Sequence, residues 1–357
     1  MKGHGGDIYA ASRELGIAAD KVIDFSASIN PLGVPKSVRA EIIAHLSQLR
    51  HYPDPSATVL NREIARSIGV DQESILCGNG STELIYLVVR ALQPKRVLIP
   101  APTFSEYERA CIVNSPLKKT KSINSFIDHF DLAEKNEYRT NPHKFIDAMT
   151  GHNLAFICNP NNPTGGLIKR SNMLRIAEAA RETACYLVVD EAFIDFIPRE
   201  SIVTKVKNNP YLIVLRSLTK FYALSGLRIG YAVIHPELSN AIERFKEPWT
   251  VNTLAQLAGA ATLKDADYAT KTFRIIEEEK AHLEAGFKRM GIKYYPSRIN
   301  FYLLRLDNAS DVVSKLRTKG ILVRDCSNFR GLNNSHIRIA VRSRRENGRL
   351  LRELAKL

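Results

Sequence analysis

Four short apolar runs in the middle of the chain constrain its fold more than any other feature of the sequence. They span Arg96–Ile99, Leu154–Ile157, Tyr186–Val189 and Leu212–Leu215. Apolar runs of this length are typical of strands that are buried on both faces of a sheet. A helical pattern over Met173–Ala184 separates two of them. This alternation predicts an α/β fold, in which a mostly parallel central sheet is flanked by helices.

The pattern of alternating apolar runs and helical segments changes towards both ends of the chain. We expect residues 1–35 to form a polar N-terminal arm and residues 36–245 to form the large α/β domain. We expect residues 246–357 to form an interdomain helix and a smaller α+β C-terminal domain, against which the arm packs. About two domains is also the ordinary expectation for a chain of 357 residues.

The C-terminal region shows helical and strand patterns in turn. A long helical stretch is predicted over about 252–290. The strands predicted after it are Phe301–Leu304, Ile321–Val323 and Ile337–Val341. A helix over Asp311–Lys319 is expected between the first two strands, with Ser310 as its N-cap and Gly320 as its stop.

Charge and cysteine content narrow the class of protein. The chain has 51 basic and 37 acidic residues, a net charge of +14, and the excess is spread along the sequence. Because no zinc finger, RNA-recognition signature or basic zipper is present, we expect no nucleic-acid partner. No apolar run reaches the roughly 18 residues of a membrane span, and the N-terminus lacks a secretory signal. Five widely spaced cysteines without a CxxC pair favour a cytoplasmic protein with neither disulfides nor a bound metal.

Candidate site residues follow the predicted strands, where ligands bind in open α/β sheets. The turn Asn159–Gly165 holds three asparagines, Asp190 follows one strand and Lys220 follows another. A buried carboxylate needs a positive partner, and a partly desolvated lysine amine suits Schiff-base chemistry. Each feature alone also has an ordinary explanation: a plain turn, an internal ion pair or a solvated surface lysine.

A glycine turn adds a fourth feature. Gly78–Thr82 leads into a predicted helix over Glu83–Leu92, and the free N–H groups of a helix N-terminus bind anions. Together the four features match a ligand with a phosphate, an aldehyde for the lysine, a ring nitrogen for the aspartate and a ring oxygen for an asparagine. Pyridoxal 5'-phosphate (PLP) carries all four groups.

The order of these motifs resembles that of the fold-type I PLP enzymes of the aspartate aminotransferase superfamily. The motifs are Asn159–Gly165, Asp190-Glu-Ala, Ser217-x-Thr-Lys220 and Gly226-Leu-Arg228-x-Gly230. The resemblance implies two catalytic residues, Lys220 as the lysine that binds the cofactor and Asp190 as the partner of its ring nitrogen. It also assigns further cofactor contacts: Asn162 to the ring oxygen, Phe104 to the ring face, and Ser81, Thr82, Ser217 and Arg228 to the phosphate.

The resemblance also implies an assembly. Tyr52, in the segment His51-Tyr-Pro-Asp54, is similar to the tyrosine that family members donate to the cofactor phosphate of a neighbouring subunit. A homodimer with shared active sites is therefore expected.

Two groups within the superfamily compete for the function. One comprises the threonine-phosphate decarboxylases, which make (R)-1-amino-2-propanol phosphate and CO2 from O-phospho-L-threonine for cobalamin biosynthesis. The other comprises the histidinol-phosphate aminotransferases. The segments His4–Asp7 and Asp24–Gly33 resemble the decarboxylases. Phe193 does too, because the aminotransferases usually carry a tyrosine there whose hydroxyl bonds the ring oxygen.

The implied substrate is a small anionic phosphorylated amino acid. Arg324 and Arg338 match the substrate arginines of the family, and arginine suits the recognition of oxyanions. His4, Asn30 and Asn162 are expected in the same pocket, and which arginine binds phosphate and which carboxylate stays open. A non-catalytic PLP-binding regulator or a nucleic-acid-binding module is a third possibility, suggested only by the net charge.

Overall fold

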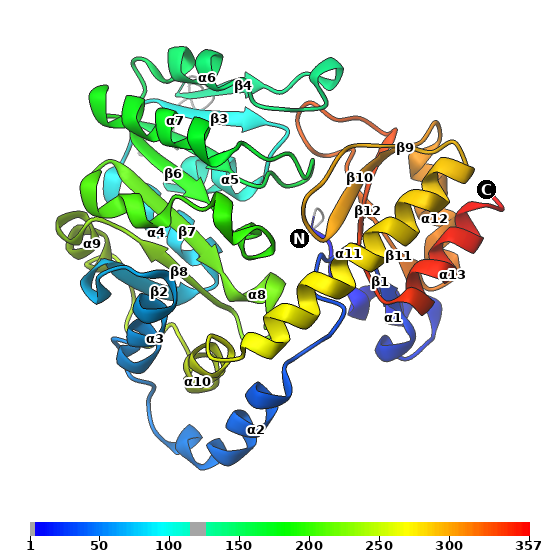
Figure 1. The fold of residues 1–357 in the computed structure, drawn as a ribbon, viewed down its shortest axis with the longest axis horizontal. Coiled ribbons are helices and arrows are strands. Elements are labelled where there is room, and N and C mark those ends of the chain that lie inside the picture. The colour runs from blue at the N-terminus through cyan, green and yellow to red at the C-terminus, as the bar shows by residue number, and fades with distance from the viewer. Residues whose placement is uncertain (1–3, 115–125) are drawn as a thin grey trace.

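The structure is a computed structural model that describes residues 4–114 and 126–357 (Figure 1). Its larger sheet has seven strands in the order β2-β8-β7-β6-β5-β3-β4. The strands are β2 (Ile75–Asn79), β3 (Val97–Ala101), β4 (Ile127–Asp131), β5 (Leu154–Cys158), β6 (Tyr186–Asp190), β7 (Leu212–Ser217) and β8 (Ile229–Val233). Only β8 runs antiparallel to its neighbours in this sheet. The predicted α/β fold with a mostly parallel sheet is confirmed.

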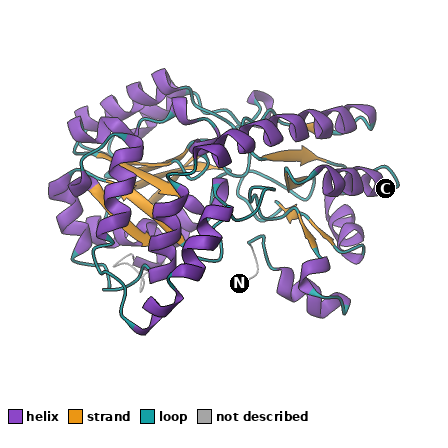
Figure 2. Cartoon of the chain, turned by 60° about the horizontal axis from the view of Figure 1, so that its bottom comes forward, coloured by secondary structure: helices purple, strands orange, loops and turns teal. Residues whose placement is uncertain are grey.

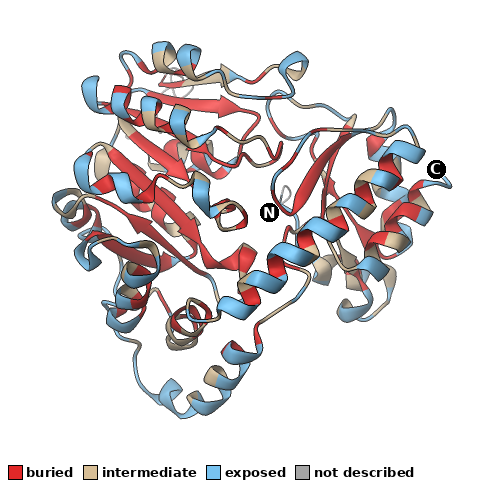
Figure 3. Ribbon diagram, in the orientation of Figure 1, coloured by how far each residue is buried: buried red, intermediate tan, exposed pale blue. Residues whose placement is uncertain are grey.

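Helices cover both faces of this sheet (Figure 2). They are α3 (Thr58–Ile68), α4 (Ser81–Leu92), α5 (Glu106–Asn114), α6 (Pro142–Met149), α7 (Arg170–Glu182), α8 (Leu218–Phe221), α9 (Pro236–Glu243) and α10 (Thr253–Thr262). Leu187 and Val189 of β6 pack in the core beneath α3, α6, α7 and α10. Val188, between them, packs in the opposite core with α4, α5 and α9. Alternate residues of β6 thus enter two cores, which explains why this strand is apolar up to Asp190 and buried (Figure 3).

The C-terminal region has its own core and sheet. The antiparallel strands β9 (Lys293–Tyr294), β10 (Phe301–Arg305), β12 (Arg324–Asp325) and β13 (His336–Ala340) lie in the order β12-β13-β10-β9. They are accompanied by α11 (Ala266–Arg289), α12 (Ala309–Thr318) and α13 (Arg344–Leu354). Figure 1 shows α11 crossing from the larger sheet to this region.

The N-terminal arm packs against the C-terminal region, as expected. It contains α1 (Ile8–Leu15) and β1 (Ile23–Asp24), and β1 pairs in parallel with β11 (Ile321–Leu322). The helix α2 (Lys36–Ala44) then leads into the large α/β region. The arm therefore runs past the junction of the two regions, while the boundaries at residues 35 and 245 stay predictions.

Two predicted elements differ in detail. The helical stretch over 252–290 is divided into α10 and α11, because the side chain of Asp265 accepts a hydrogen bond from the backbone of Tyr268 and starts a second helix. The helix α12 begins two residues before the expected point, with Asn308 rather than Ser310 at the N-cap. Gly320, with a φ of +71°, follows its end as predicted. Within residues 4–114 and 126–357, every helix is too short or too polar to cross a membrane.

Candidate active site

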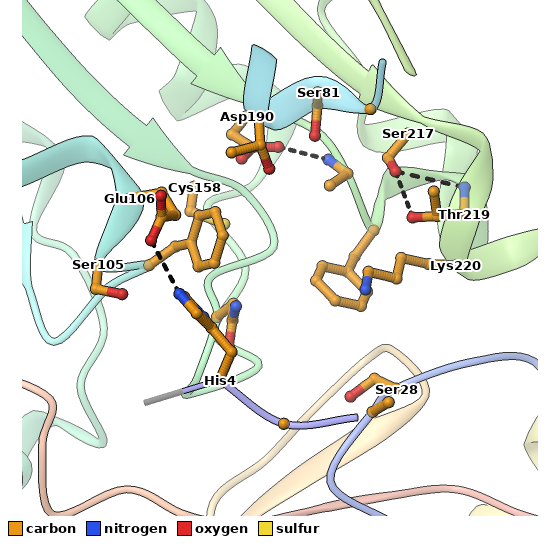
Figure 4. Close-up of a pocket in the computed structure, with 18 of the residues that line it drawn as sticks. His4, Ser28, Ser81, Ser105, Glu106, Cys158, Asp190, Ser217, Thr219 and Lys220 are labelled. Atoms are coloured by element: carbon orange, nitrogen blue, oxygen red, sulfur yellow. Dashed lines mark hydrogen bonds and ion pairs between the residues drawn. The ribbon is translucent and has the colours of Figure 1, made fainter. Parts of the chain in front are cut away.

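A cavity of about 730 Å³ lies at the carboxyl ends of β5, β6 and β7, where the larger sheet meets the arm and the C-terminal region. A cavity of this size suits a cofactor with a small substrate. It brings together eleven of the predicted residues: His4, Ser81, Thr82, Phe104, Asn162, Asp190, Ser217, Lys220, Arg228, Arg324 and Arg338. Figure 4 shows Asp190, Ser217 and Lys220 on one side of the cavity and His4 and Ser28, from the arm, on the other.

Asp190 is the last residue of β6 and is 3% exposed. One carboxylate oxygen accepts a hydrogen bond from the Tyr107 hydroxyl at 2.6 Å, and the other accepts one from the Ala192 backbone at 2.9 Å. Burial raises the pKa of the Asp190 carboxyl above its ordinary value, although these hydrogen bonds oppose the shift. A buried carboxylate of this kind is stabilised by a cation, such as a protonated ring nitrogen.

Lys220 lies on the short helix α8, which begins where β7 ends. Burial lowers the pKa of Lys220 to about 8, and the positive charges of Arg338 and Arg228 contribute to the shift. The neutral amine is therefore more accessible near neutral pH than it is on a solvated lysine. That state is the one that attacks an aldehyde.

The turn before α4 forms a cradle for an anion. Gly80 has a φ of +76°, and a Cβ there would lie 2.4 Å from Nη2 of Arg228. A Cβ on Gly230 would lie 2.4 Å from the backbone nitrogen of Ser81. The glycines thus allow a guanidinium and the N-terminus of α4 to converge, and Ser217 and Thr82 add hydroxyls to the same cavity.

The three asparagines of the turn Asn159–Gly165 have different roles. The Asn159 side chain exchanges two hydrogen bonds with the backbone of Ile168, and Asn161 binds Thr103, Thr164 and the Pro102 carbonyl. Both are therefore structural. Only Asn162 lines the cavity, where its side-chain oxygen accepts a hydrogen bond from Arg338.

The two predicted substrate arginines stand opposite each other on β12 and β13. Arg338 is 8% exposed and donates to Asn162 and, at 2.8 Å, to the backbone carbonyl of Ser26. Arg324 donates to the Asp325 carbonyl and to Asn328. Burial lowers the pKa of Arg338 to about 10, and the neighbouring Arg324 charge adds to the effect. Two buried cations this close favour an anionic ligand.

Asn30 is a predicted substrate residue that the structure does not place in the cavity lining. It is 2% exposed and lies outside the cavity lining. Its amide nitrogen donates to the Phe221 carbonyl and to Thr272, both at 2.7 Å, and its oxygen accepts from the Leu32 backbone. These bonds hold the backbone beside Lys220, and the expected contact of Asn30 with a substrate stays a prediction.

Tyr52 also lies outside the cavity of this chain. Its side chain is 80% exposed and stacks on Trp249 with ring centroids 4.7 Å apart. Its expected role towards a neighbouring subunit stays a prediction.

Several residues of the site were missed from the sequence. Tyr107, the partner of Asp190, and Glu106, the partner of His4, both begin α5 within the segment that had supplied Phe104. Thr219, which the motif Ser217-x-Thr-Lys220 already contained, shares a 2.7 Å hydrogen bond with Ser217. Glu106 and Tyr107 stand two and three positions after Phe104, but nothing in the local sequence indicated their partners.

The residues present fit PLP. The cavity offers an anion cradle at Gly80, a buried carboxylate at Asp190, an amine of lowered pKa at Lys220 and an amide at Asn162. These groups match a phosphate, a ring nitrogen, an aldehyde and a ring oxygen. The strongest evidence for this fit is the absence of a Cβ at Gly80 and Gly230. It lets Arg228 and the start of α4 come close enough to bind one phosphate.

Comparisons with known proteins agree with this geometry. The chain is 39% identical to the threonine-phosphate decarboxylase of Salmonella typhimurium strain LT2, over 98% of this chain and 95% of that protein. The histidinol-phosphate aminotransferase structure from Clostridium acetobutylicum is 31% identical, with a TM-score of 0.85 over 94% of this chain and 98% of that chain. The L-threonine-O-3-phosphate decarboxylase structure from Porphyromonas gingivalis is 28% identical, with a TM-score of 0.82 over 94% and 99%. The family model for aminotransferase class I and II matches residues 20–354, and this chain belongs to that family.

Proposed function

We propose that this chain is a PLP-dependent carboxy-lyase that converts O-phospho-L-threonine to (R)-1-amino-2-propanol phosphate and CO2, for cobalamin biosynthesis. The observation that carries the proposal is the pair of neighbouring arginines, Arg324 and Arg338, that line the same cavity as Lys220. A substrate with both a carboxylate and a phosphate supplies two anions for this wall. The 39% identity to a protein named threonine-phosphate decarboxylase supports the same substrate class.

Arg338 shows why an anion is needed. Its guanidinium is buried, its hydrogen-bond partners Asn162 and Ser26 are neutral, and its Nε lacks a hydrogen-bond partner among the described residues. Leaving a buried cation without an opposite charge is costly. A carboxylate or phosphate oxygen bound there would relieve that cost, so substrate binding is favoured by electrostatics that already exist in the cavity.

The residues around the reacting centre have separate tasks. PLP, when bound, supplies an electron sink for the pair of electrons left on the substrate Cα after CO2 departs. Asp190 would hold a proton on the ring nitrogen of the cofactor, and a protonated ring withdraws electrons more strongly. Lys220, with its lowered pKa, exchanges a proton near neutral pH and delivers one to Cα. The protein thus sets which bond of Cα breaks mainly by anchoring the substrate anions.

Phe193 favours decarboxylation over transamination. Its ring lines the cavity, is 4% exposed and packs edge-on against Phe301, with centroids 5.1 Å apart. Lys220 Nζ lies 6.0 Å from the ring centroid. A phenylalanine offers no hydroxyl to the ring oxygen, unlike the tyrosine usual in the related aminotransferases. The runner-up function, histidinol-phosphate aminotransferase, would fit less well with this residue.

The proposal includes a cytoplasmic homodimer with shared active sites. Exposed apolar side chains gather around α2 and the segment that follows it, with Ile43 70%, Leu49 55% and Tyr52 80% exposed. Such a cluster on one part of a surface suits contact with a second copy of the chain.

The reaction is tested directly by incubating the PLP-loaded protein with O-phospho-L-threonine in the absence of any keto acid. Equal amounts of CO2 and aminopropanol phosphate are expected, and K220A should form neither. Absence of CO2, together with glutamate-dependent amino transfer to the keto partner of histidinol phosphate, would replace the lyase with the aminotransferase.

A further inference from the structure

Glu106 lies in the wall of the active-site cavity, yet it is not among the groups that would hold the cofactor. Its side chain is 7% exposed. One carboxylate oxygen lies 2.9 Å from Nε2 of His4, and the other accepts a hydrogen bond from the Tyr86 hydroxyl at 2.8 Å. Arg109, one turn along α5, approaches it to 3.4 Å. A buried carboxylate in a cavity built for an anionic substrate is unfavourable unless it performs a task there.

The residues that follow His4 contact Ser26, further along the arm, and through it a residue of the C-terminal region. We call residues 4–6 the N-terminal strap. A Cβ on Gly5 would lie 2.3 Å from the Ser26 carbonyl oxygen, and the backbone of Gly6 donates to the Ser26 hydroxyl at 2.8 Å. The same Ser26 carbonyl accepts a hydrogen bond from Arg338. The strap therefore links Glu106 of the large region to the substrate arginine of the C-terminal region.

We propose that Glu106 is a positioning residue that anchors the N-terminal strap across the cavity and fixes the His4 ring for the substrate. With Nε2 of His4 bound to Glu106, Nδ1 is the ring nitrogen left for a ligand. Phe104 lies beside the same imidazole, with ring centroids 6.0 Å apart. Glu106 thus acts on the substrate through His4, while Arg109 offsets its charge. The inference rests on the proposed function for the identity of the substrate.

The first test is kinetic and uses the PLP-loaded enzyme with O-phospho-L-threonine. E106A and E106Q should raise KM about tenfold and leave kcat and the PLP absorbance nearly unchanged, because a hydrogen bond to a charged group is worth roughly that factor. H4A should have a similar effect, and the double variant H4A/E106A should be no worse than either single variant. E108Q is the matched control, since Glu108 lies on the same helix but faces His129 outside the cavity.

The second test needs no activity. Hydrogen exchange in the peptide covering residues 4–14 should be faster in E106A than in the wild-type protein, and unchanged in E108Q. Additive effects of H4A and E106A on KM, or unchanged exchange in the arm, would overturn the proposal. If the wild-type protein releases no CO2, the proposed function fails, and the exchange experiment still decides whether Glu106 anchors the strap. E106Q, which preserves shape, serves if E106A does not fold.

Discussion

The hydroxyl of Tyr107 donates a 2.6 Å hydrogen bond to the Asp190 carboxylate, and both side chains are almost completely buried. Tyr107 is itself held by Phe156, on which it stacks at 4.9 Å, and by the edge of Phe104. The carboxylate that would pair with the cofactor is thus oriented by a rigid donor. Since burial raises the pKa of Asp190 and this hydrogen bond opposes the shift, Tyr107 helps to keep Asp190 charged.

Y107F should therefore weaken cofactor binding. Loss of the donor raises the pKa of Asp190 further, so a smaller fraction of the carboxylate is charged and available to a protonated ring nitrogen. A hydrogen bond to a charged group contributes about 1.5–3 kcal/mol, so PLP affinity should fall at least about tenfold. Fluorescence titration of the cofactor-free protein measures this. Y211F, whose tyrosine lies outside the cavity, is the control, and equal affinities of Y107F and wild type would contradict the assignment.

The lowered pKa of Lys220 predicts a pH dependence for PLP capture. The capture rate should rise through about pH 8 as the ammonium loses its proton. Because the Arg338 charge lowers this pKa, R338Q should move the midpoint to higher pH and slow capture below it, with the rates converging at alkaline pH. Stopped-flow absorbance against pH is the measurement. R342Q is the control, because Arg342 pairs with Glu346 outside the cavity, and it should keep the wild-type midpoint. A wild-type midpoint in R338Q would show that the Arg338 charge has no influence on Lys220.

F193Y tests the choice between two reactions. The added hydroxyl gives the cavity a donor for the ring oxygen, as in the related aminotransferases. We expect decarboxylation of O-phospho-L-threonine to fall about tenfold, the equivalent of one hydrogen bond, and keto-acid-dependent amino transfer to become detectable. CO2 and the amino-acid product are measured in the same reaction. An unchanged ratio of the two products would mean that Phe193 does not select the reaction.

N30A separates a structural role from a substrate contact. Removing the amide leaves the Phe221 carbonyl, Thr272 and the Leu32 backbone without their partner in a buried place. The free energy of unfolding should fall by about 3 kcal/mol, since each unsatisfied buried group costs roughly 1–3 kcal/mol and relaxation recovers part of it. KM for O-phospho-L-threonine should change little. Urea unfolding and steady-state kinetics measure the two effects, and a large rise in KM with unchanged stability would restore Asn30 to the substrate site.

Local sequence patterns predicted most of the large domain because each signal lay within one element. The strand Tyr186–Asp190 is apolar along its whole length since its alternate residues enter two cores, and Asp190 at its end follows directly from that placement. The glycines at positions 80 and 230 were visible in the motifs for the same reason. The cavity then follows, because parallel strands bring their carboxyl ends to one edge of a sheet.

Pairings across long separations could not be predicted in this way. Tyr107 reaches Asp190 across 83 residues, and Asn30 reaches Phe221 and Thr272 across 191 and 242 residues. The residues next to a tyrosine on a helix or an asparagine in a loop do not indicate which distant residue it will contact. Asn30 was therefore placed in the substrate pocket, whereas the fold uses it to fix the backbone next to Lys220.

Mixing two inactive variants tests whether active sites are shared between subunits. K220A lacks the lysine, and Y52A lacks the exposed tyrosine expected to reach a neighbouring cofactor phosphate. In a mixed dimer one site combines Lys220 from one subunit with Tyr52 from the other, while the second site lacks both. Random mixing gives half mixed dimers, so about a quarter of the wild-type CO2 release should return after subunit exchange. If Tyr52 served its own chain's site, every site in the mixture would remain defective. If it served no site, Y52A alone would release CO2 like the wild type. In either case mixing would add no activity beyond that of the separate variants.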